Sequence, residues 1–438
     1  MKNLFLFAAI AIISLMMLSC SSDNAEDLDE AKTVVNMLST PIPVRLTPAQ
    51  KVFVNDNNGF TLNFLKTVNE TDRSGKSFIY SPLSITYVLG MVNDAATGQT
   101  EKELEQTLGF HEGGIQAVNE FCKNLIDNLP KVDKDVTLDI ANAIFLNKNY
   151  QLKEQFQKDM KEYYDAQAEA LDFSSPATLG HINGWCNDKT KGMIPNILDE
   201  VDPNMMSYLL NAIYFKADWT SKFDPKNTKT ETFTMEKGST KLPMMHQSVL
   251  INYMKNDTYS AVKIPYGNGY WDMTVMLPEE GKTTDDIVSL LAEKGFDEEA
   301  IYNNEFIPLD YYVFSPAEVD LKLPSYETSS DTNDMKDGLI GLMEKMGIRL
   351  AFNPFNEDIC NMCAQPVYIA MMRQKAKIKV NEEGSEAAAV TVAGMKVNAL
   401  SEPPKYSKAT FHANRPFVYV IREASSGVIL FVGKFTGE

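Results

Sequence analysis

Four histidines and five cysteines are the residues of this 438-residue chain that could bind a metal or act in catalysis. No histidine lies in a His-Glu-x-x-His pair or beside a cysteine pair at zinc-ligand spacing. Cys360 and Cys363 form a single Cys-x-x-Cys without partner ligands, so a local disulfide or two buried thiols fit it better than a redox centre. The chain also lacks a Gly-x-Ser-x-Gly nucleophile elbow. We therefore expect no enzymatic activity, no metal and no cofactor.

Segment 381–393 has a different potential, because it can become a β-strand. It reads Asn-Glu-Glu-Gly-Ser-Glu-Ala-Ala-Ala-Val-Thr-Val-Ala and contains no proline, so every residue can donate a hydrogen bond to a neighbouring strand. Side chains alternate between the two faces of a strand. The face that starts at Ser385 then carries only small residues, namely Ser385, Ala387, Ala389, Thr391 and Ala393. Gly384 supplies a permissive hinge. The alternative is a short alanine-rich helix.

The hydrophobic pattern of the rest of the chain predicts helices mainly in the first half and strands mainly in the second. We expect helices at residues 57–68, 83–94, 99–108, 114–128, 153–164, 182–192 and 336–347. We expect strands at residues 77–81, 139–146, 208–216, 261–265, 271–277, 319–324 and 367–380. No change in composition divides the chain after residue 50. The sequence therefore predicts one α+β domain.

The amino terminus resembles that of an exported bacterial lipoprotein. Lys2 precedes an apolar run, residues 4–18, that is too short for a comfortable membrane span. Met17-Leu18-Ser19-Cys20 resembles a lipobox, in which the cysteine becomes the lipidated first residue. We expect a signal peptide at 1–19, a lipidated Cys20 with an acidic linker at 20–50, and a folded domain at 51–438. The alternative is an ordinary signal peptide that is cleaved beyond Cys20.

The overall charge also limits the partners. The formal net charge of −18 disfavours binding to nucleic acid, and the 44% apolar content is ordinary for a globular chain. We expect export, with attachment to the outer membrane only through the lipid, on its periplasmic side or at the cell surface. We expect the protein to be a monomer.

Segment 381–393 resembles the proximal hinge of the reactive-centre loop of inhibitory serpins. Further matches follow in order along residues 51–438. They include Tyr80-Ser81-Pro82-Leu83-Ser84-Ile85, Leu210-Asn211-Ala212-Ile213-Tyr214-Phe215-Lys216, Val319-Asp320-Leu321-Lys322-Leu323-Pro324, Phe411-His412-Ala413-Asn414-Arg415-Pro416-Phe417 and Ile429-Leu430-Phe431-Val432-Gly433-Lys434. The resemblance implies the serpin fold, a single domain with a large central sheet, two further sheets, eight to nine helices and an exposed loop.

The resemblance also implies a function. Serpins are suicide-substrate inhibitors that trap a serine endopeptidase, with cysteine endopeptidases as a further possible class. The protease cleaves the loop, and the freed hinge inserts into the central sheet. The hinge residues here are Glu383, Gly384, Ser385, Glu386, Ala387, Ala388, Ala389, Val390 and Thr391. Their small inward side chains favour inhibition. The alternative is a non-inhibitory serpin-fold binding protein.

Counting from Gly384 as in inhibitory serpins places the scissile bond at Asn398–Ala399. The loop is longer than in many family members, so other residues remain candidates for the cleaved position: Met395, Lys396, Leu400 and Lys405. Lys396 would select trypsin-like proteases. Met395 or Leu400 would select chymotrypsin-, elastase- or subtilisin-like proteases. These proteases, from a host or a competitor, are the expected partners.

A cluster beneath the opening sheet is also implied by the family, and we call it the sheet-opening cluster. Its residues here are Ser81, Ser84, Asn211, Trp219 and Gln374. Gln374 stands where serpins have a histidine. An amide can both donate and accept hydrogen bonds, so the network can persist, but without the pH response of an imidazole. The alternative is that Gln374 is simply a satisfied buried amide.

Overall fold

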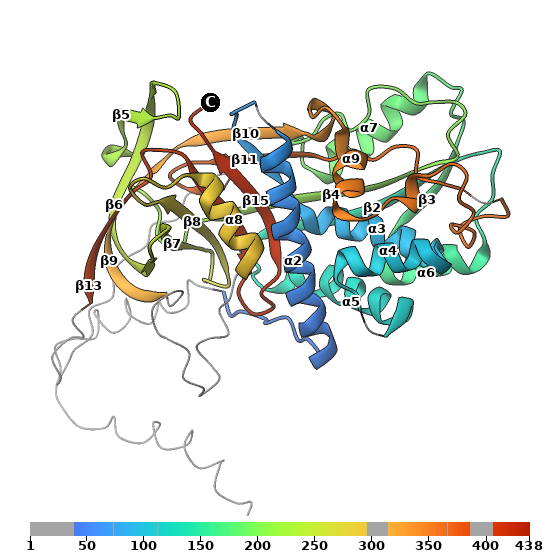
Figure 1. Ribbon diagram of the computed structural model, residues 1–438, viewed down its shortest axis with the longest axis horizontal. Helices are drawn as coiled ribbons and strands as arrows, with labels where there is room; N and C mark the ends of the chain where they lie inside the picture. Colours follow the sequence, from blue (N-terminus) through green and yellow to red (C-terminus); the bar gives the residue numbers. More distant parts are fainter. Residues whose placement is uncertain (1–38, 73, 112, 296–313, 366, 386–405) are drawn as a thin grey trace, which may run out of the picture.

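The computed structural model describes residues 39–72, 74–111, 113–295, 314–365, 367–385 and 406–438. Cys20, the hinge from Glu386 onward and every candidate for the scissile bond lie outside these ranges. The described residues form an α+β fold, as predicted, with one six-stranded and one nine-stranded sheet (Figure 1).

The six-stranded sheet is the large central sheet expected from the sequence. Its order is β10 (Tyr326–Asp331), β11 (Lys375–Val380), β12 (Gly384–Ser385), β4 (Ser207–Asp218), β2 (Thr137–Asn147) and β3 (Gln167–Leu171). Only β2 and β3 pair in parallel, and the other neighbours are antiparallel. Among the described residues, β12 has only two, and no other described strand pairs between β11 and β4.

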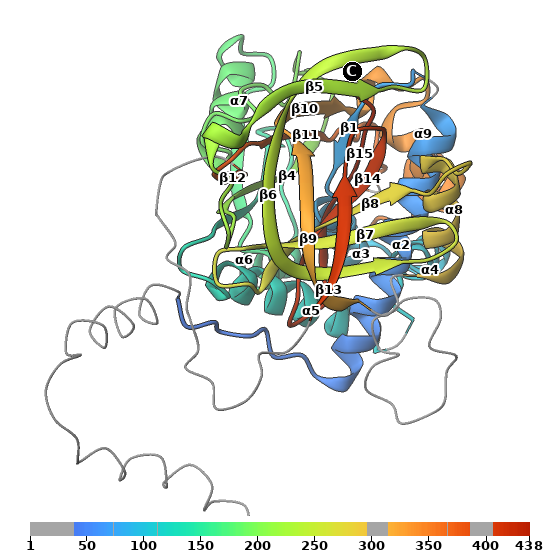
Figure 2. The same ribbon diagram turned by 90° about the vertical axis from the view of Figure 1, so that its left-hand side faces the viewer.

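The other strands form a single nine-stranded sheet rather than two separate ones. Its order is β1 (Phe78–Tyr80), β15 (Ile429–Phe435), β14 (Phe417–Glu423), β8 (Trp271–Pro278), β7 (Tyr259–Tyr266), β6 (Ser239–Lys255), β9 (Ser315–Pro324) and β13 (Ser407–His412), and β5 (Lys229–Thr234) pairs with β6. The 17-residue β6 joins the two expected sheets because it pairs with β9 and β5 along one part and with β7 along the other (Figure 2).

Eight α-helices surround the sheets in the described part of the chain. They are α2 (Pro48–Thr71), α3 (Pro82–Ala95), α4 (Gly98–Leu108), α5 (Gly114–Asn128), α6 (Glu154–Tyr164), α7 (Ala177–Lys189), α8 (Thr284–Lys294) and α9 (Gly338–Met346). Helix α7 lies on one face of β2 and β4, and α3 lies on the opposite face (Figure 1). The main core lies between the sheets and the α2–α5 helices, and a smaller apolar cluster lies under α7.

Helix α2 begins earlier than predicted, at Pro48 instead of residue 57. The hydroxyl of Thr47 accepts a hydrogen bond from the Gln50 amide, and the Gln50 side chain accepts one from the Thr47 amide. This capping box, followed by proline at the first helical position, fixes the start of the helix. The amide of Ile42 donates to the Val132 carbonyl, so the folded part begins before residue 51.

Strand β11 is shorter than the predicted strand at 367–380. It begins at Lys375, which pairs with Asp331, the last residue of β10. On its other side, β11 pairs with β12 only through Val380 and Ser385. Within the described part of the chain, residues 367–374 join no strand ladder, and Val367 forms only an isolated bridge with Ile359. In the described residues, no helix has both the length and the apolarity needed to cross a bilayer.

Candidate functional site: the hinge and the groove below it

The predicted hinge enters the six-stranded sheet at Gly384 and Ser385. Ser385 pairs with Val380 of β11 and Ala217 of β4, and Gly384 pairs with Asp218. Gly384 has a φ of +153°, and a Cβ atom there would lie 2.2 Å from the carbonyl oxygen of Ala217. Only glycine fits this position without displacing the backbone. The first two residues of an inserted strand are therefore already in place.

The side chain of Ser385 is held inside the sheet by Tyr266. Ser385 is buried, and its Oγ lies 2.8 Å from the Oη of Tyr266. The ring of Tyr266 stacks on Trp219 with ring centroids 4.3 Å apart, and the Trp219 Nε1 donates to the Asn381 carbonyl. Burial raises the pKa of the Tyr266 phenol far above its usual value, so the phenol stays protonated and available for this hydrogen bond.

Charged residues hold the hinge immediately before Gly384. Lys222 Nζ lies 2.6 Å from a Glu383 carboxylate oxygen and 2.9 Å from one of Asp218. Burial alone would lower the pKa of Lys222, but its hydrogen bonds to Glu383 and Asp218 raise the pKa overall. Glu382 accepts a hydrogen bond from the hydroxyl of Thr228 at 2.7 Å. Both hinge glutamates are thus tied to the segment that follows β4.

Gln374 is fully engaged with Ser81 in the sheet-opening cluster. Its Oε1 accepts from the Ser81 amide at 3.1 Å, and its Nε2 donates to the Ser81 carbonyl at 2.7 Å. The backbone amide of Gln374 donates to the Thr332 hydroxyl. The Ser81 hydroxyl donates to the Leu430 carbonyl. Gln374 is therefore a satisfied buried amide that also joins β11 to the start of α3.

Ser84 and Asn211 form the other half of this cluster. The Ser84 hydroxyl donates to the Asn211 Oδ1, and the Asn211 Nδ2 donates to the Asn142 Oδ1 at 2.8 Å. The structure thus brings Ser81, Ser84, Asn211 and Gln374 beneath the sheet. Trp219 does not share their contacts, because it lies beside the hinge, where it packs on Tyr266 and Phe223.

A cavity of about 470 Å³ lies where β12 would continue between β4 and β11. Its lining follows β4 from Ser207 to Phe215 and the opposite side from Val367 to Lys379, with Ser385 at the end. Six methionines contribute to it: Met193, Met205, Met206, Met362, Met371 and Met372. Unbranched thioether side chains adapt easily to a new neighbour. We call this cavity the insertion groove.

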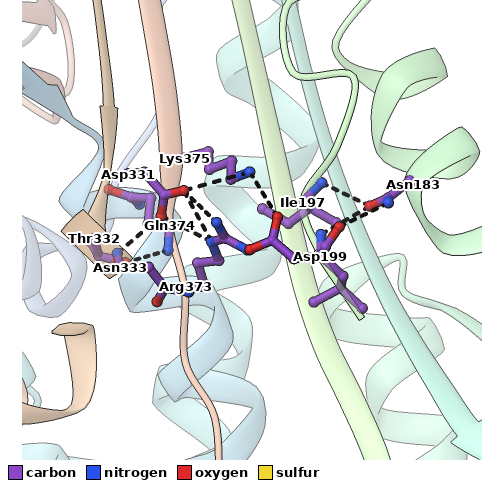
Figure 3. A network of polar contacts seen from close by, with 10 residues as sticks. Asn183, Ile197, Asp199, Asp331, Thr332, Asn333, Arg373, Gln374 and Lys375 are labelled. Atoms are coloured by element: carbon purple, nitrogen blue, oxygen red, sulfur yellow. Dashed lines mark hydrogen bonds and ion pairs between the residues drawn. The ribbon is translucent and has the colours of Figure 1, made fainter. Parts of the chain in front are cut away.

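Charged side chains join Arg373 and Lys375, which line the insertion groove, to Asp199 on the segment between α7 and β4 (Figure 3). Arg373 donates from Nε and Nη2 to Asp331, at 2.9 and 2.5 Å, and from Nη1 to Asp199 at 2.6 Å. Lys375 Nζ lies 3.5 Å from Asp331. Burial alone would raise the pKa of Asp331, but the hydrogen bonds from Arg373 hold that pKa below its usual value.

The four cysteines of the described residues form no disulfide. Cys122, Cys186, Cys360 and Cys363 are free thiols, so the Cys-x-x-Cys pair is not a disulfide. Cys363 is buried and Cys360 is half-buried. Burial raises the pKa values of Cys122 and Cys186 to about 12, which keeps both thiols protonated and unreactive. No group of acidic, histidine and cysteine residues suited to a metal is found in the part of the chain that the structure describes.

Sequence reasoning missed four residues of this site: Asp199, Lys222, Tyr266 and Arg373. Each acts through a partner more than 100 residues away or on another strand, as Tyr266 does with Ser385. No local motif marks them. The alternation that placed Ser385 on the inward face was the signal that could have led to Tyr266, because a buried serine hydroxyl needs a partner.

The comparisons with known proteins agree with this architecture. The family model described as "Serpin (serine protease inhibitor)" matches residues 55–437. "Serpin B6" of Macaca fascicularis is 29% identical over 393 residues, covering 88% of this chain and 99% of the relative. "Serine protease inhibitor 42Dd" of Drosophila melanogaster is 31% identical over 372 residues, covering 82% of this chain and 91% of the relative.

Solved structures share the fold. The native state of the thermophilic serpin tengpin superposes with a TM-score of 0.75 at 24% identity, covering 92% of this chain and 98% of tengpin. The chain belongs to the serpin family. The family of the sequence resemblance and the serpin fold are therefore confirmed.

Proposed function

We propose that this serpin is a suicide-substrate inhibitor of serine endopeptidases, with cysteine endopeptidases as a further target class. The observation that carries the proposal is the hinge itself. Gly384 and Ser385 occupy the sheet between β11 and β4, and the insertion groove lies directly below them. An inserting strand therefore has both a starting point and room to continue.

The register of β12 supports insertion of the residues that follow it. After insertion, the same register would place Ala387, Ala389 and Thr391 opposite Ile378, Ala376 and Gln374 of the β11 side. Ile378 and Ala376 are buried and face the core. The residues that would face them are small, so a full strand can enter without displacing the core. About ten new backbone hydrogen bonds at ~1 kcal/mol each would release on the order of 10 kcal/mol.

The chemistry of the trap uses the protease's own machinery. The protease serine oxygen attacks the carbonyl carbon of the cleaved residue and forms an ester, the C–N bond breaks, and the released amine takes the proton that the serine gave up. As the freed strand inserts, it carries the ester-linked protease along the sheet and distorts the protease's active site. The distorted site cannot hydrolyse the ester. The strain stored in the incomplete sheet supplies the free energy.

The loop sequence indicates which proteases we expect to be trapped. We propose Asn398–Ala399 as the scissile bond, with Met395, Lys396, Leu400 and Lys405 as alternatives. Cleavage after Lys396 would define a trypsin-like target, and cleavage after Met395 or Leu400 an elastase- or subtilisin-like one. Sequencing the amino terminus of the released fragment identifies the bond.

Incubation with trypsin-, elastase- and subtilisin-like proteases, followed by denaturing electrophoresis, tests the proposal. We expect an adduct that resists detergent. Ser385→Arg should abolish it while leaving loop cleavage intact, because Ser385 is 3% exposed and cannot be replaced by a long charged side chain. Glu386→Arg is the matched control and should keep the adduct, because side-chain alternation would place residue 386 on the solvent face of an inserted strand. If the unmodified protein is cleaved in the loop but forms no adduct with any of these proteases, the proposal is wrong. That result would favour a non-inhibitory binding protein.

We further propose that the protein is exported and anchored to the outer membrane through a lipid on Cys20, as a monomer. The support is the sequence of residues 1–30, with its apolar run, its lipobox-like end and its acidic linker. Metabolic labelling with a radioactive fatty acid tests it. The label should appear on the unmodified protein and be lost in Cys20→Ala. Equal labelling of both proteins would contradict lipidation at this residue.

A further inference from the structure

The segment that joins α7 to β4 is fixed to α7 just before Asp199. The amides of Ile197 and Leu198 both donate to Asn183 Oδ1, at 2.8 and 2.9 Å, and Asn183 Nδ2 donates to the Leu198 carbonyl at 2.9 Å. Ile197 and Leu198 are buried in the apolar cluster under α7. Asp199 is therefore attached to the α7 and β4 side of the groove (Figure 3).

Arg373 belongs to the opposite side of the insertion groove. Its Nε and Nη2 are bound to Asp331 of β10, and its side chain is only 8% exposed. This leaves Nη1 directed at Asp199, whose side chain is 68% exposed and lies 2.6 Å away. A fixed guanidinium needs little further ordering to hold a carboxylate. Lys375, 3.9 Å from the same carboxylate, adds a second positive charge.

We propose that the Asp199–Arg373 contact is a latch that sets the rate at which the hinge advances beyond Ser385. The proposal rests on the proposed function. Continuing the register of β12 would place Val390 opposite Lys375 and Val392 opposite Arg373, so the advancing strand would enter between the two sides that the latch joins. An added strand separates its two neighbours by two strand spacings, roughly 10 Å. Asp199 and Arg373 lie on opposite sides of that opening, so their contact breaks as the strand passes.

The latch residues position the two sides of the groove and take no part in the acyl chemistry. Opening the latch exchanges a partly desolvated ion pair for two hydrated groups, while Arg373 keeps Asp331 as a partner. A pair of this kind changes a rate by about three- to fivefold when it is removed. Because one partner is exposed, salt should weaken the pair.

The experiment follows uptake of a fluorescent synthetic peptide with the sequence of residues 386–397 by the intact protein, and it needs no protease. We expect Asp199→Asn to take up the peptide about three- to fivefold faster than the unmodified protein. Glu200→Gln removes the same charge from the neighbouring exposed residue and should leave the rate unchanged. Asp199→Glu keeps the carboxylate, so its uptake rate should stay within about twofold of that of the unmodified protein.

Salt separates a latch from a general loosening of the fold. Raising sodium chloride from about 0.05 to 0.5 M should accelerate uptake by the unmodified protein but not by Asp199→Asn. Equal rates in Asp199→Asn and the unmodified protein, or equal salt responses, would overturn the latch. The outcome is distinct from that for inhibition. If the protein forms adducts but Asp199→Asn does not change peptide uptake, the inhibitor proposal holds and the latch proposal fails. If Asp199→Asn speeds uptake but no adduct forms, the latch proposal holds and the inhibitor proposal fails.

Discussion

The hydroxyl oxygens of Ser385 and Tyr266 lie 2.8 Å apart, although 119 residues separate them in the chain. This contact joins the two sheets, because Ser385 belongs to the six-stranded sheet and Tyr266 to the nine-stranded one. Both side chains are buried. The hinge is therefore held at its first inward residue before any protease has acted on the loop.

Removing the Tyr266 hydroxyl should loosen the hinge. We expect Tyr266→Phe to lose about 1 kcal/mol of unfolding free energy, the net value of one buried hydrogen bond. Amide hydrogen exchange at Ser385 should accelerate about fivefold, measured by mass spectrometry. The double variant with Ser385→Ala should cost less than the sum of the single variants, because both remove the same contact. Unchanged exchange at Ser385 would show that the hydroxyl pair does not hold the hinge.

Replacing Gly384 should expel the hinge from the sheet. A Cβ atom there would lie 2.2 Å from the Ala217 carbonyl oxygen, and the positive φ is strained for any other residue. We expect Gly384→Ala to lower the unfolding free energy by about 2 kcal/mol or more, as measured by urea denaturation.

Gly184→Ala is the matched control for that experiment. Gly184 lies within helix α7, and a Cβ atom there meets nothing within 4 Å. Alanine in a helix interior should be neutral or stabilise by up to about 1 kcal/mol. Equal effects of the two substitutions would contradict the close approach at Gly384.

Gln374→His should introduce a pH response that the natural residue lacks. A neutral imidazole can accept from the Ser81 amide and donate to the Ser81 carbonyl, as Gln374 does. Its protonation removes the acceptor and leaves a buried amide unpaired, which costs about 1–3 kcal/mol. The variant should therefore be less stable at pH 5.5 than at pH 8, relative to the unmodified protein. If the melting temperatures of the two proteins change equally between pH 5.5 and pH 8, the side chain at position 374 does not make these hydrogen bonds to Ser81.

Asp94 should make the protein less stable as the pH rises. Burial raises the pKa of this carboxyl from 3.8 to about 6, although a hydrogen bond from Asn119 opposes the shift. The folded state thus holds a proton that the unfolded state has lost, so this contribution is complete below pH 3.8 and disappears as the pH passes 6.

Asp94→Asn should remove this dependence and stabilise the protein by about 1–2 kcal/mol at pH 7.5, with little effect at pH 4. Denaturation in urea at both pH values measures the difference. An equal effect of the substitution at the two pH values would show that Asp94 does not titrate as described.

Local patterns were sufficient to predict much of the fold. Helices 99–108 and 114–128 and the inward face of Ser385 follow from residue spacing, because one face of each element is buried. The start of α2 was misplaced because a polar capping box, with no apolar periodicity, decides it. The predicted strand at 367–380 was too long because a strand also needs a partner, and β10 ends opposite Lys375.

The site could be predicted only in part. Ser81, Ser84, Asn211 and Gln374 were grouped only through the family resemblance, and the structure shows Ser81 bonded to Gln374 and Ser84 bonded to Asn211. The contact of Arg373 with Asp199 spans 174 residues and depends on how α7 lies over the sheet. Charged residues are abundant in any sequence, and nothing local distinguishes the two that meet.

The two ends of the reactive-centre loop belong to different sheets, and this decides what happens to the chain once the loop is cut. Strand β13 pairs with β9, and β14 lies between β8 and β15 with every residue buried. The carboxy-terminal piece therefore supplies interior strands and cannot dissociate without unfolding the protein. After cleavage, the two polypeptides should therefore remain associated as one folded molecule. In native conditions the cut protein should migrate as a single species, and only denaturant should release the small fragment.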